Sequence, residues 1–267
     1  VLIPAFAVER TQEVLYLLGE FFRDGLIPEM PVYLDSPLAI AATEIFRKMQ
    51  SFYDEDTAAI VAEGHDPFNF PQLVLTRSTQ ESMAINESRG PAIVVAGNGM
   101  CTAGRIMHHL KHNIWRRGAS LVIVGFQAQG TLGRRIVDGA QMVKIFGEQF
   151  MVKAKLFTIG GFSAHADQAD LLEWLGNFEN PLLRVYAIHG EPTVARGFAQ
   201  VVQEHLGFIT YAPAIGDIIP LTPFHADAVK EELEDLKWQR HLMRLVQRAE
   251  EIRSLWDSHP KAFSRKL

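Results

Sequence analysis

Residues 92–126, AIVVAGNGMCTAGRIMHHLKHNIWRRGASLVIVGF, decide the fold class. An unbroken apolar run over 92–97 predicts a strand buried on both faces, and the segment over about 102–116 has the period of an amphipathic helix. A second apolar run over 120–126 predicts the next strand. Apolar, β-branched runs separated by helices are typical of parallel strands with helices on both faces. The sequence therefore predicts an α/β protein with a parallel sheet.

The same unit extends in both directions along the chain. Ser36 is placed to cap a helix that has Pro37 at its first position, and Ser78 and Glu81 have the spacing of a capping box. A segment over about 54–71 is punctuated by Pro and Gly and is expected to be a loop. The other elements of this part are strands over 2–6, 31–35 and 73–76 and helices over about 9–24, 37–52 and 131–138.

Beyond residue 140 the alternation changes. The runs 142–146 and 151–157, joined by Gly-Glu-Gln, predict a β-hairpin. After a boundary near 158–161, the pattern predicts a helix over about 168–177, a strand over 184–188, a helix over about 192–206, a strand over 209–213 and a charged helical tail over about 224–258. We therefore divide the chain into residues 1–160, residues 161–221 and a helical extension over 222–267.

Composition excludes several classes of protein. Of the 267 residues 48% are hydrophobic, yet no apolar run approaches the roughly 18 residues of a membrane span, so we expect a cytoplasmic protein. Cys101 is the single cysteine, which excludes an internal disulfide and a cysteine-built zinc finger. The chain begins at Val1 inside an apolar run that reads as a strand, and we expect it to be a fragment of a longer protein.

Charge is unevenly distributed along the chain. The net charge is −5, but residues 1–100 carry 6 basic and 14 acidic residues, and residues 136–267 carry 14 and 17. Between them, residues 101–135 contain no carboxylate and six cations: Arg105, Lys111, Arg116, Arg117, Arg134 and Arg135. This stretch is interpreted either as a local anion-attracting surface or as a solvated helix face.

Two histidines follow apolar strands and precede helices. His165 lies in GGFSAHAD and His189 in AIHGE, each with a nearby carboxylate, Asp167 or Glu191. In a parallel sheet, consecutive strand ends lie at one edge, so the two imidazoles are expected to converge there and to form half of a metal or phosphate site. Loop histidines bonded to backbone are the alternative.

Other motifs give weaker signals. The segment from Gly161 to His165, with Ser163 in it, imitates a nucleophile elbow, but that motif needs glycine where His165 stands. GFQAQGTLGRR (125–135) lacks the Walker signature, although its amides and Arg134 are placed to contact a phosphate at the N-terminus of the next helix. His108, His109 and His112 lack the glutamate of a zinc-binding helix, and we interpret them as residues of the helix surface or of a cleft.

Six ordered motifs carry a resemblance to a known family. VLIPAFAVERTQEVLYLL, PVYLDSPLA, GNGMCTAGRIMHHLKHN, LVIVGFQAQGTLGR, FTIGGFSAHADQ and AIHGE together resemble the β-CASP branch of the metallo-β-lactamase superfamily, which includes the RNA 3′-end-processing endonuclease and ribonuclease J. The resemblance covers about residues 1–220. It implies that residues 1–160 are a β-CASP domain and that 161–221 return into a metallo-β-lactamase domain.

The resemblance also implies roles for single residues. His189 corresponds to a ligand of one of two zinc ions, and His165 to the general acid or a hydrogen-bond donor beside the scissile phosphate. Ser163 corresponds to a phosphate-binding and catalytic residue, with Gly161 in the same motif, and Arg105 is expected to face the RNA cleft. The family's H-x-H-x-D-H signature is not present in these residues, so the two-zinc site is expected to be incomplete or absent in this fragment.

Our first functional hypothesis is therefore that the parent protein is a zinc-dependent RNA nuclease and that this portion is inactive alone. The second is a non-catalytic RNA-binding or scaffold relative that has lost its metal site. The third is a domain that binds a nucleotide or small metabolite. RNA is the expected partner, and homodimerisation through the tail is left open.

Overall fold

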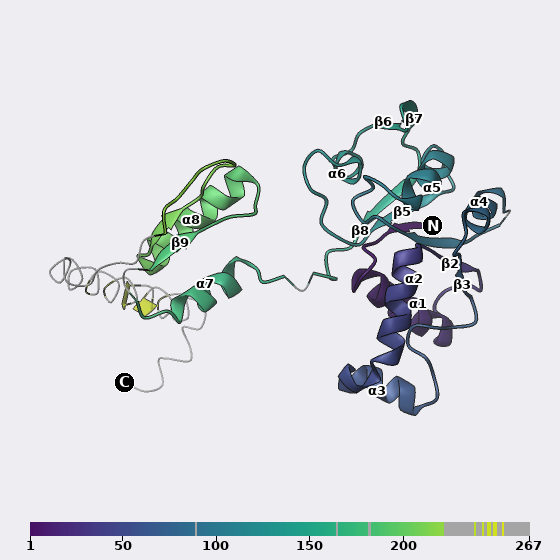
Figure 1. Cartoon of the computed structure of the whole chain (residues 1–267), viewed down its shortest axis with the longest axis horizontal. Coiled ribbons are helices and arrows are strands. Elements are labelled where there is room, and N and C mark those ends of the chain that lie inside the picture. Colours follow the sequence, from purple (N-terminus) through teal and green to yellow (C-terminus); the bar gives the residue numbers. More distant parts are fainter. Residues whose placement is uncertain are drawn as a thin grey trace. The chain divides into compact units, whose positions relative to one another are not determined.

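The computed structural model describes residues 1–221, except positions 89, 164, 181 and 182, together with isolated positions 238, 242, 245, 246, 248, 249 and 253. Contacts divide the chain into two compact units, of which the first is Val1–Ser163 and the second follows it (Figure 1). Most of the predicted helical tail over 224–258 lies outside the described residues. Among those described, no helix is both long and apolar enough to span a bilayer.

The first unit is built on a six-stranded sheet in the order β3-β2-β4-β1-β5-β8. Every neighbouring pair in it is parallel, as the apolar runs predicted. Its strands are β1 (Leu2–Pro4), β2 (Val32–Asp35), β3 (Leu73–Leu75), β4 (Ile93–Ala96), β5 (Ser120–Ile123) and β8 (Lys155–Thr158).

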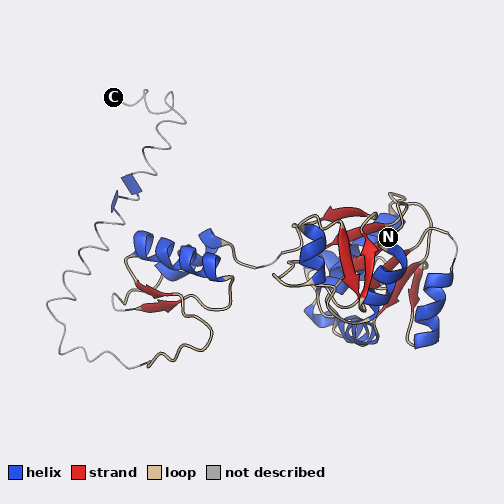
Figure 2. Cartoon of the chain, turned by 90° about the horizontal axis from the view of Figure 1, so that it is seen from above, coloured by secondary structure: helices blue, strands red, loops and turns tan. Residues whose placement is uncertain are grey.

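Helices cover both faces of this sheet (Figures 1 and 2). One core cluster contains Ile106, Leu110 and Ile136, and the cluster on the other face contains Leu15 and Ile40. The helices of the first unit are α1 (Arg10–Arg23), α2 (Pro37–Lys48), α3 (Glu55–Ala62), α4 (Thr79–Glu87), α5 (Arg105–Asn113) and α6 (Leu132–Val137), with a 3₁₀ turn η1 (Gln50–Phe52). This arrangement confirms the predicted α/β class. Because all six strands are parallel, the loops that follow them lie at one edge of the sheet, which we call the carboxyl edge.

Local sequence signals explain where two helices begin. The hydroxyl of Ser36 accepts a hydrogen bond from the amide of Ala39, and Pro37 occupies the first turn of α2. Ser78 and Glu81 form the predicted capping box of α4. Both caps satisfy amides that the helices themselves leave unpaired, so the two helix starts were correctly read from sequence.

Three expectations for the first unit were wrong. The segment 54–71, expected to be a loop, contains α3, because the Asp54 carboxylate accepts from the amide of Thr57 and caps a helix. The hairpin pairs β6 (Met142–Ile145) with β7 (Glu148–Met151), whereas Lys155–Thr158 forms a sixth parallel strand beside β5. The helix expected over 102–116 begins only at Arg105, since Gly104 before it has a φ of 79°.

The second unit contains a small βαβ element. Strands β9 (Arg184–Tyr186) and β10 (Ile209–Tyr211) pair in parallel and are connected by α8 (Pro192–Leu206); α7 (Gln168–Gly176) precedes them. Its core is formed by Leu175, Val202 and Phe208. Each of these elements lies where the sequence predicted it, within two residues at each end.

Candidate functional site

His189 lies in the turn between β9 and α8 and is exposed. Its φ is 68°, in the left-handed region that residues other than glycine rarely adopt. Such a conformation costs about 1–3 kcal/mol and is found most often at functional sites, where the surrounding structure holds it. The strand end and the helix start at Pro192 fix both sides of this turn.

His165 lies two residues after Ser163 in the segment that precedes α7, and both side chains are exposed. The amide of Ser163 donates to the carbonyl of Gly160. At Gly161, φ is not in the left-handed region, and an added Cβ would meet no atom within 4 Å, so no steric reason requires glycine there. Asp167, predicted to flank a ligand site, caps α7 by accepting from two of its amides.

The topology does not support the argument that one sheet edge brings His165 and His189 together. His165 follows β8, which belongs to the six-stranded sheet, whereas His189 follows β9, whose partner among the described strands is β10. Within the described part of the chain, no group of three or more His, Cys, Asp or Glu side chains is placed to hold a metal ion. The described residues therefore do not fit a complete zinc site, which takes at least three protein ligands.

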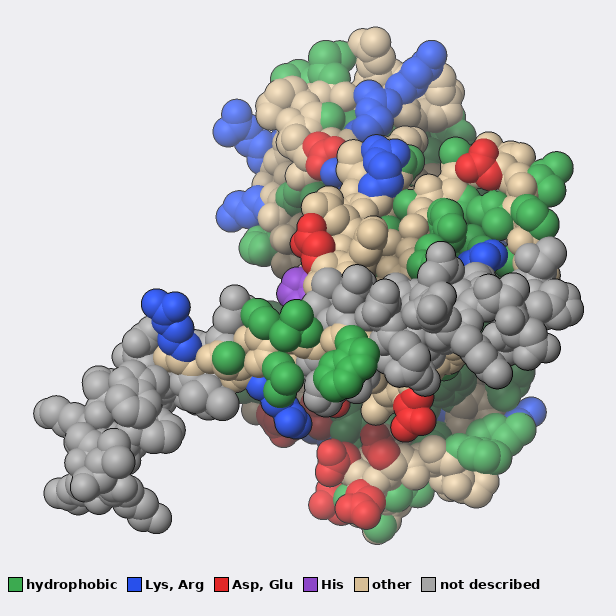
Figure 3. All heavy atoms as spheres, turned by 90° about the vertical axis from the view of Figure 1, so that its left-hand side faces the viewer, with side chains coloured by type: hydrophobic (Ala, Val, Ile, Leu, Met, Phe, Trp, Pro, Cys, Tyr) green, Lys and Arg blue, Asp and Glu red, His purple; other side chains and the backbone are tan. Residues whose placement is uncertain are grey.

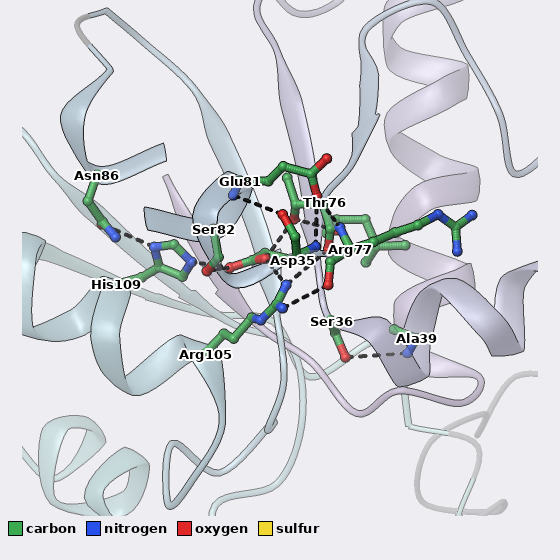
Figure 4. A network of polar contacts seen from close by, with 12 residues as sticks. Asp35, Ser36, Ala39, Thr76, Arg77, Glu81, Ser82, Asn86, Arg105 and His109 are labelled. Carbon is green, nitrogen blue, oxygen red and sulfur yellow. Dashed lines mark hydrogen bonds and ion pairs between the residues drawn. The ribbon is translucent and has the colours of Figure 1, made fainter. Parts of the chain in front are cut away.

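Arg105, predicted to face the RNA cleft, directs its guanidinium into the first unit (Figure 4). Nη1 donates to Oδ1 of Asp35 at 2.7 Å and to the carbonyl of Thr76 at 3.0 Å, and Nη2 donates to the carbonyl of Arg77 at 2.9 Å. The Arg105 side chain is 20% exposed and that of Asp35 is fully buried. Arg105 thus connects the start of α5 to the carboxyl ends of β2 and β3.

His109 was interpreted as a helix-surface or RNA-cleft residue, and this interpretation was wrong. Its ring is fully buried, with Nε2 placed 2.6 Å from Oδ2 of Asp35 and Nδ1 placed 3.1 Å from the side chain of Asn86. Position 109 lies one turn after Arg105 on α5, so both side chains reach the same carboxylate. The helix therefore presents His109 to the interior.

Asp35 is the centre of this polar network. Its two oxygens also accept hydrogen bonds from the hydroxyls of Thr76 and Ser82, each at 2.6 Å. Burial raises the pKa of the Asp35 carboxyl, but the hydrogen bonds from His109, Ser82, Thr76 and Arg105 outweigh it and hold the pKa well below its usual range. Asp35 is consequently an ionised, fully hydrogen-bonded buried carboxylate.

Sequence reasoning did not single out Asp35, Thr76, Ser82 or His109 as a group. One signal was available: Asp35 is the last residue of an apolar strand and directly precedes a helix cap. A carboxylate at such a strand end needs a partner or solvent. The partners lie 41 to 74 positions away along the chain, so no local spacing identifies them.

The carboxylate-free stretch is partly neutralised in the folded chain. Lys111 pairs with Glu148, and Arg134, predicted to contact phosphate, pairs with Asp138 while its amide donates to the Thr131 hydroxyl that caps α6. In the view of Figure 3, acidic side chains gather towards the end of the first unit that carries α3, and lysines and arginines lie at the opposite end. The charge separation read from the sequence is therefore also spatial.

Comparison with known protein families gives two matches. Residues 11–136 match the model of the Beta-Casp domain, and residues 150–213 match that of the Zn-dependent metallo-hydrolase RNA specificity domain. The first match falls within the six-stranded unit. The second includes β8, the histidine segment, and the β9–α8–β10 element.

Curated relatives agree with these matches. The chain is 42% identical over 191 residues to Ribonuclease TTHA0252 of Thermus thermophilus, which covers 72% of this chain and 43% of the relative. It is 33% identical over 227 residues to Transcription termination factor FttA of Pyrococcus horikoshii (83% and 35%) and 29% identical over 221 residues to an RNase J-like protein of Methanocaldococcus jannaschii (83% and 50%). The chain thus spans half the length of these relatives or less. It belongs to the β-CASP branch of the metallo-β-lactamase superfamily.

Proposed function

We propose that this chain is the β-CASP and C-terminal portion of a zinc-dependent ribonuclease of the metallo-β-lactamase fold, which hydrolyses RNA phosphodiester bonds. The observation that carries the proposal is His189, an exposed histidine in the left-handed conformation at a strand end, inside the segment that matches the RNA specificity domain. The relatives named ribonuclease and RNase J-like support the same reaction class. Because the chain spans only part of them, the activity is proposed for the protein that contains it.

The proposed roles follow from the chemistry of phosphodiester hydrolysis. The departing oxygen needs a proton, and His165 is proposed to donate it, since histidine is the side chain that most often transfers protons in catalysis. Ser163 and Arg134 are proposed to contact the phosphate, together with the backbone at Gly161. His189 is proposed as one zinc ligand. The described residues do not complete a zinc site.

We propose that Arg105 influences RNA binding indirectly, by holding the start of α5 and the turn before it in position. Its guanidinium donates three hydrogen bonds to Asp35, Thr76 and Arg77, which fixes the start of α5. The turn over 97–104 leads directly into that helix start, so its position depends on Arg105.

The test is RNA cleavage by the full-length protein carrying His165→Ala or His189→Ala. We expect His165→Ala to lower turnover at least about 100-fold, because general acid–base groups contribute roughly 10²–10⁴-fold. His189→Ala should also lower turnover strongly, because it removes a proposed zinc ligand. The matched control is His205→Ala, because this exposed histidine bonds to the Val201 carbonyl of its own helix. Wild-type turnover in either variant would refute the corresponding role.

The non-catalytic alternative makes a different prediction for the unaltered protein. An RNA-binding relative without catalysis would bind RNA yet leave it intact when supplied with Zn²⁺. One group of similar proteins carries the name transcription termination factor, which does not mention cleavage. A protein that binds RNA without cleaving it is therefore the second candidate. Cleavage by the wild type, lost in the His165 and His189 variants, would exclude it.

A further inference from the structure

Two exposed phenylalanines stand at the carboxyl edge of the six-stranded sheet. Phe6 comes two residues after β1 and is 42% exposed, and Phe126 comes three residues after β5 and is 66% exposed. Strands β1 and β5 are paired neighbours, so both rings belong to adjacent loops at the same edge. We call these two residues the aromatic edge.

The two loops are fixed to the same glycine. A Cβ at position 99 would lie 2.9 Å from Cδ2 and Cε2 of Phe6, so the ring lies flush against Gly99. The side-chain nitrogen of Gln127 donates to the carbonyls of Gly99 at 2.8 Å and Phe126 at 3.1 Å, and Gln127 itself is 5% exposed. Close contacts therefore hold the Phe6 ring and the backbone that carries Phe126 in place, which lowers the entropy lost when a ligand stacks on the two rings.

The next strand end adds a third aromatic side chain. Phe162 follows β8, the neighbour of β5, and the guanidinium of Arg10 lies 5.1 Å from the centre of its ring. This ring is partly buried against the core, so we do not include it in the aromatic edge. Its pairing with Arg10 shows that a planar cation already stacks on an aromatic side chain at this edge.

The charge around the aromatic edge favours a nucleic acid over a peptide. No Asp or Glu occurs between residues 91 and 137, the segment that contains Gly99, Phe126 and the cations of α5 and α6. The loops that carry Gly99 and Phe126 therefore offer a basic peptide no carboxylate, and the loop of Phe6 offers only Glu9. A nucleic acid strand offers flat bases for the rings and phosphates for nearby cations, which is how sequence-tolerant single-strand binding works.

We propose that Phe6 and Phe126 stack unpaired bases of single-stranded RNA. This inference rests on the proposed function, because it takes RNA as the substrate. The RNA must then be single-stranded where it crosses the aromatic edge, since bases in a duplex are not free to stack on a protein ring. The proposed roles of the histidines do not by themselves predict this requirement.

The experiment measures binding of a fluorescently labelled single-stranded oligoribonucleotide by the full-length protein, with a chelator present so that cleavage has no part in the signal. Phe126→Leu keeps an apolar side chain but removes the ring, and we expect binding about tenfold weaker. Phe126→Trp should retain binding. The matched control is Phe52→Leu, because Phe52 on η1 is 83% exposed and outside the aromatic edge.

Two further measurements keep the outcomes distinct. Thermal unfolding of each variant checks the fold, and binding of a duplex of the same sequence should not differ between wild type and Phe126→Leu. Equal single-strand binding by Phe126→Leu and Phe52→Leu would overturn the stacking proposal while leaving the histidine roles to their own cleavage assay. Absence of any RNA binding by the wild type would overturn the proposed function as well.

Discussion

Nε2 of His109 lies 2.6 Å from Oδ2 of Asp35, and both side chains are fully buried. Two residues 74 positions apart thus form a pair beneath the loops of the carboxyl edge. Arg105, Thr76 and Ser82 complete the shell of the carboxylate. The energetics of this pair do not depend on the proposed activity.

Removal of the carboxylate should destabilise the first unit strongly. Asp35→Asn leaves Arg105 and His109 without their anionic partner, and losing one member of a buried ion pair costs about 3–5 kcal/mol. Glu44→Gln is the control, since the Arg77–Glu44 pair is exposed and should contribute little. Urea unfolding followed by circular dichroism measures both. Equal midpoints for the two variants would contradict a stabilising role of the network.

Stability should decrease in acid through Asp35. Its pKa is lowered in the folded chain, while in the unfolded chain it is close to the ordinary value of about 4. The stabilising contribution is therefore complete above about pH 4 and is lost as the pH falls towards the folded pKa. Ser82→Ala removes one hydrogen bond to the carboxylate and should make this loss smaller. Melting temperatures measured from neutral to acidic pH test this, and parallel curves for wild type and Ser82→Ala would contradict it.

Cys101 should be inert in the native protein. The side chain is fully buried, and burial raises the pKa of its thiol to about 12, so very little thiolate exists near neutral pH. Because the sequence has one cysteine, a thiol reagent reports on a single site. We expect labelling only in denaturant. Stoichiometric labelling of the native protein within minutes would show that the turn over 97–104 opens easily.

Gly104 should tolerate a side chain much less well than Gly139. Both have a φ in the left-handed region, at 79° and 87°. A Cβ at position 104 would lie 2.5 Å from the carbonyl oxygen of Gly97, whereas at position 139 it would meet nothing within 4 Å. Gly139→Ala should cost about 1–2 kcal/mol from backbone strain alone, and Gly104→Ala clearly more. Comparable losses in chemical unfolding would mean that the clash is relieved by movement of the turn.

Local signals in the sequence were sufficient for most elements of the fold. The apolar runs identified the parallel strands, and Ser36, Ser78 and Glu81 identified two helix starts, because caps act over three residues. The helix over Glu55–Ala62 was missed although Asp54 is a good cap, because the surrounding Pro and Gly residues dominated the interpretation. The partner of the strand Lys155–Thr158 was misjudged, since periodicity reveals a strand but not its neighbour.

The candidate site was harder to read from sequence for a physical reason. The resemblance implied that Arg105 faces the RNA cleft, but a buried carboxylate 70 positions earlier accepts its hydrogen bond. Nothing in the sequence distinguishes His109 from His108 or His112. Only the packing of α5 on the sheet shows that His109 is the buried one. His165 and His189 lie in loops as predicted, yet their strands belong to different sheets. Long-range pairing determines each of these outcomes.

The hydrogen bonds from Arg105 to the carbonyls of Thr76 and Arg77 have a consequence for how the first unit unfolds. Strand β3 lies at the edge of the sheet, where strands commonly fray before the rest. Here, fraying at the end of β3 would also break the hydrogen bonds from Arg105 to the carbonyls of Thr76 and Arg77, next to the buried carboxylate of Asp35. We therefore expect the end of β3 and the start of α5 to unfold together, so that the amide hydrogens that follow β3 exchange with solvent about as slowly as those of α5.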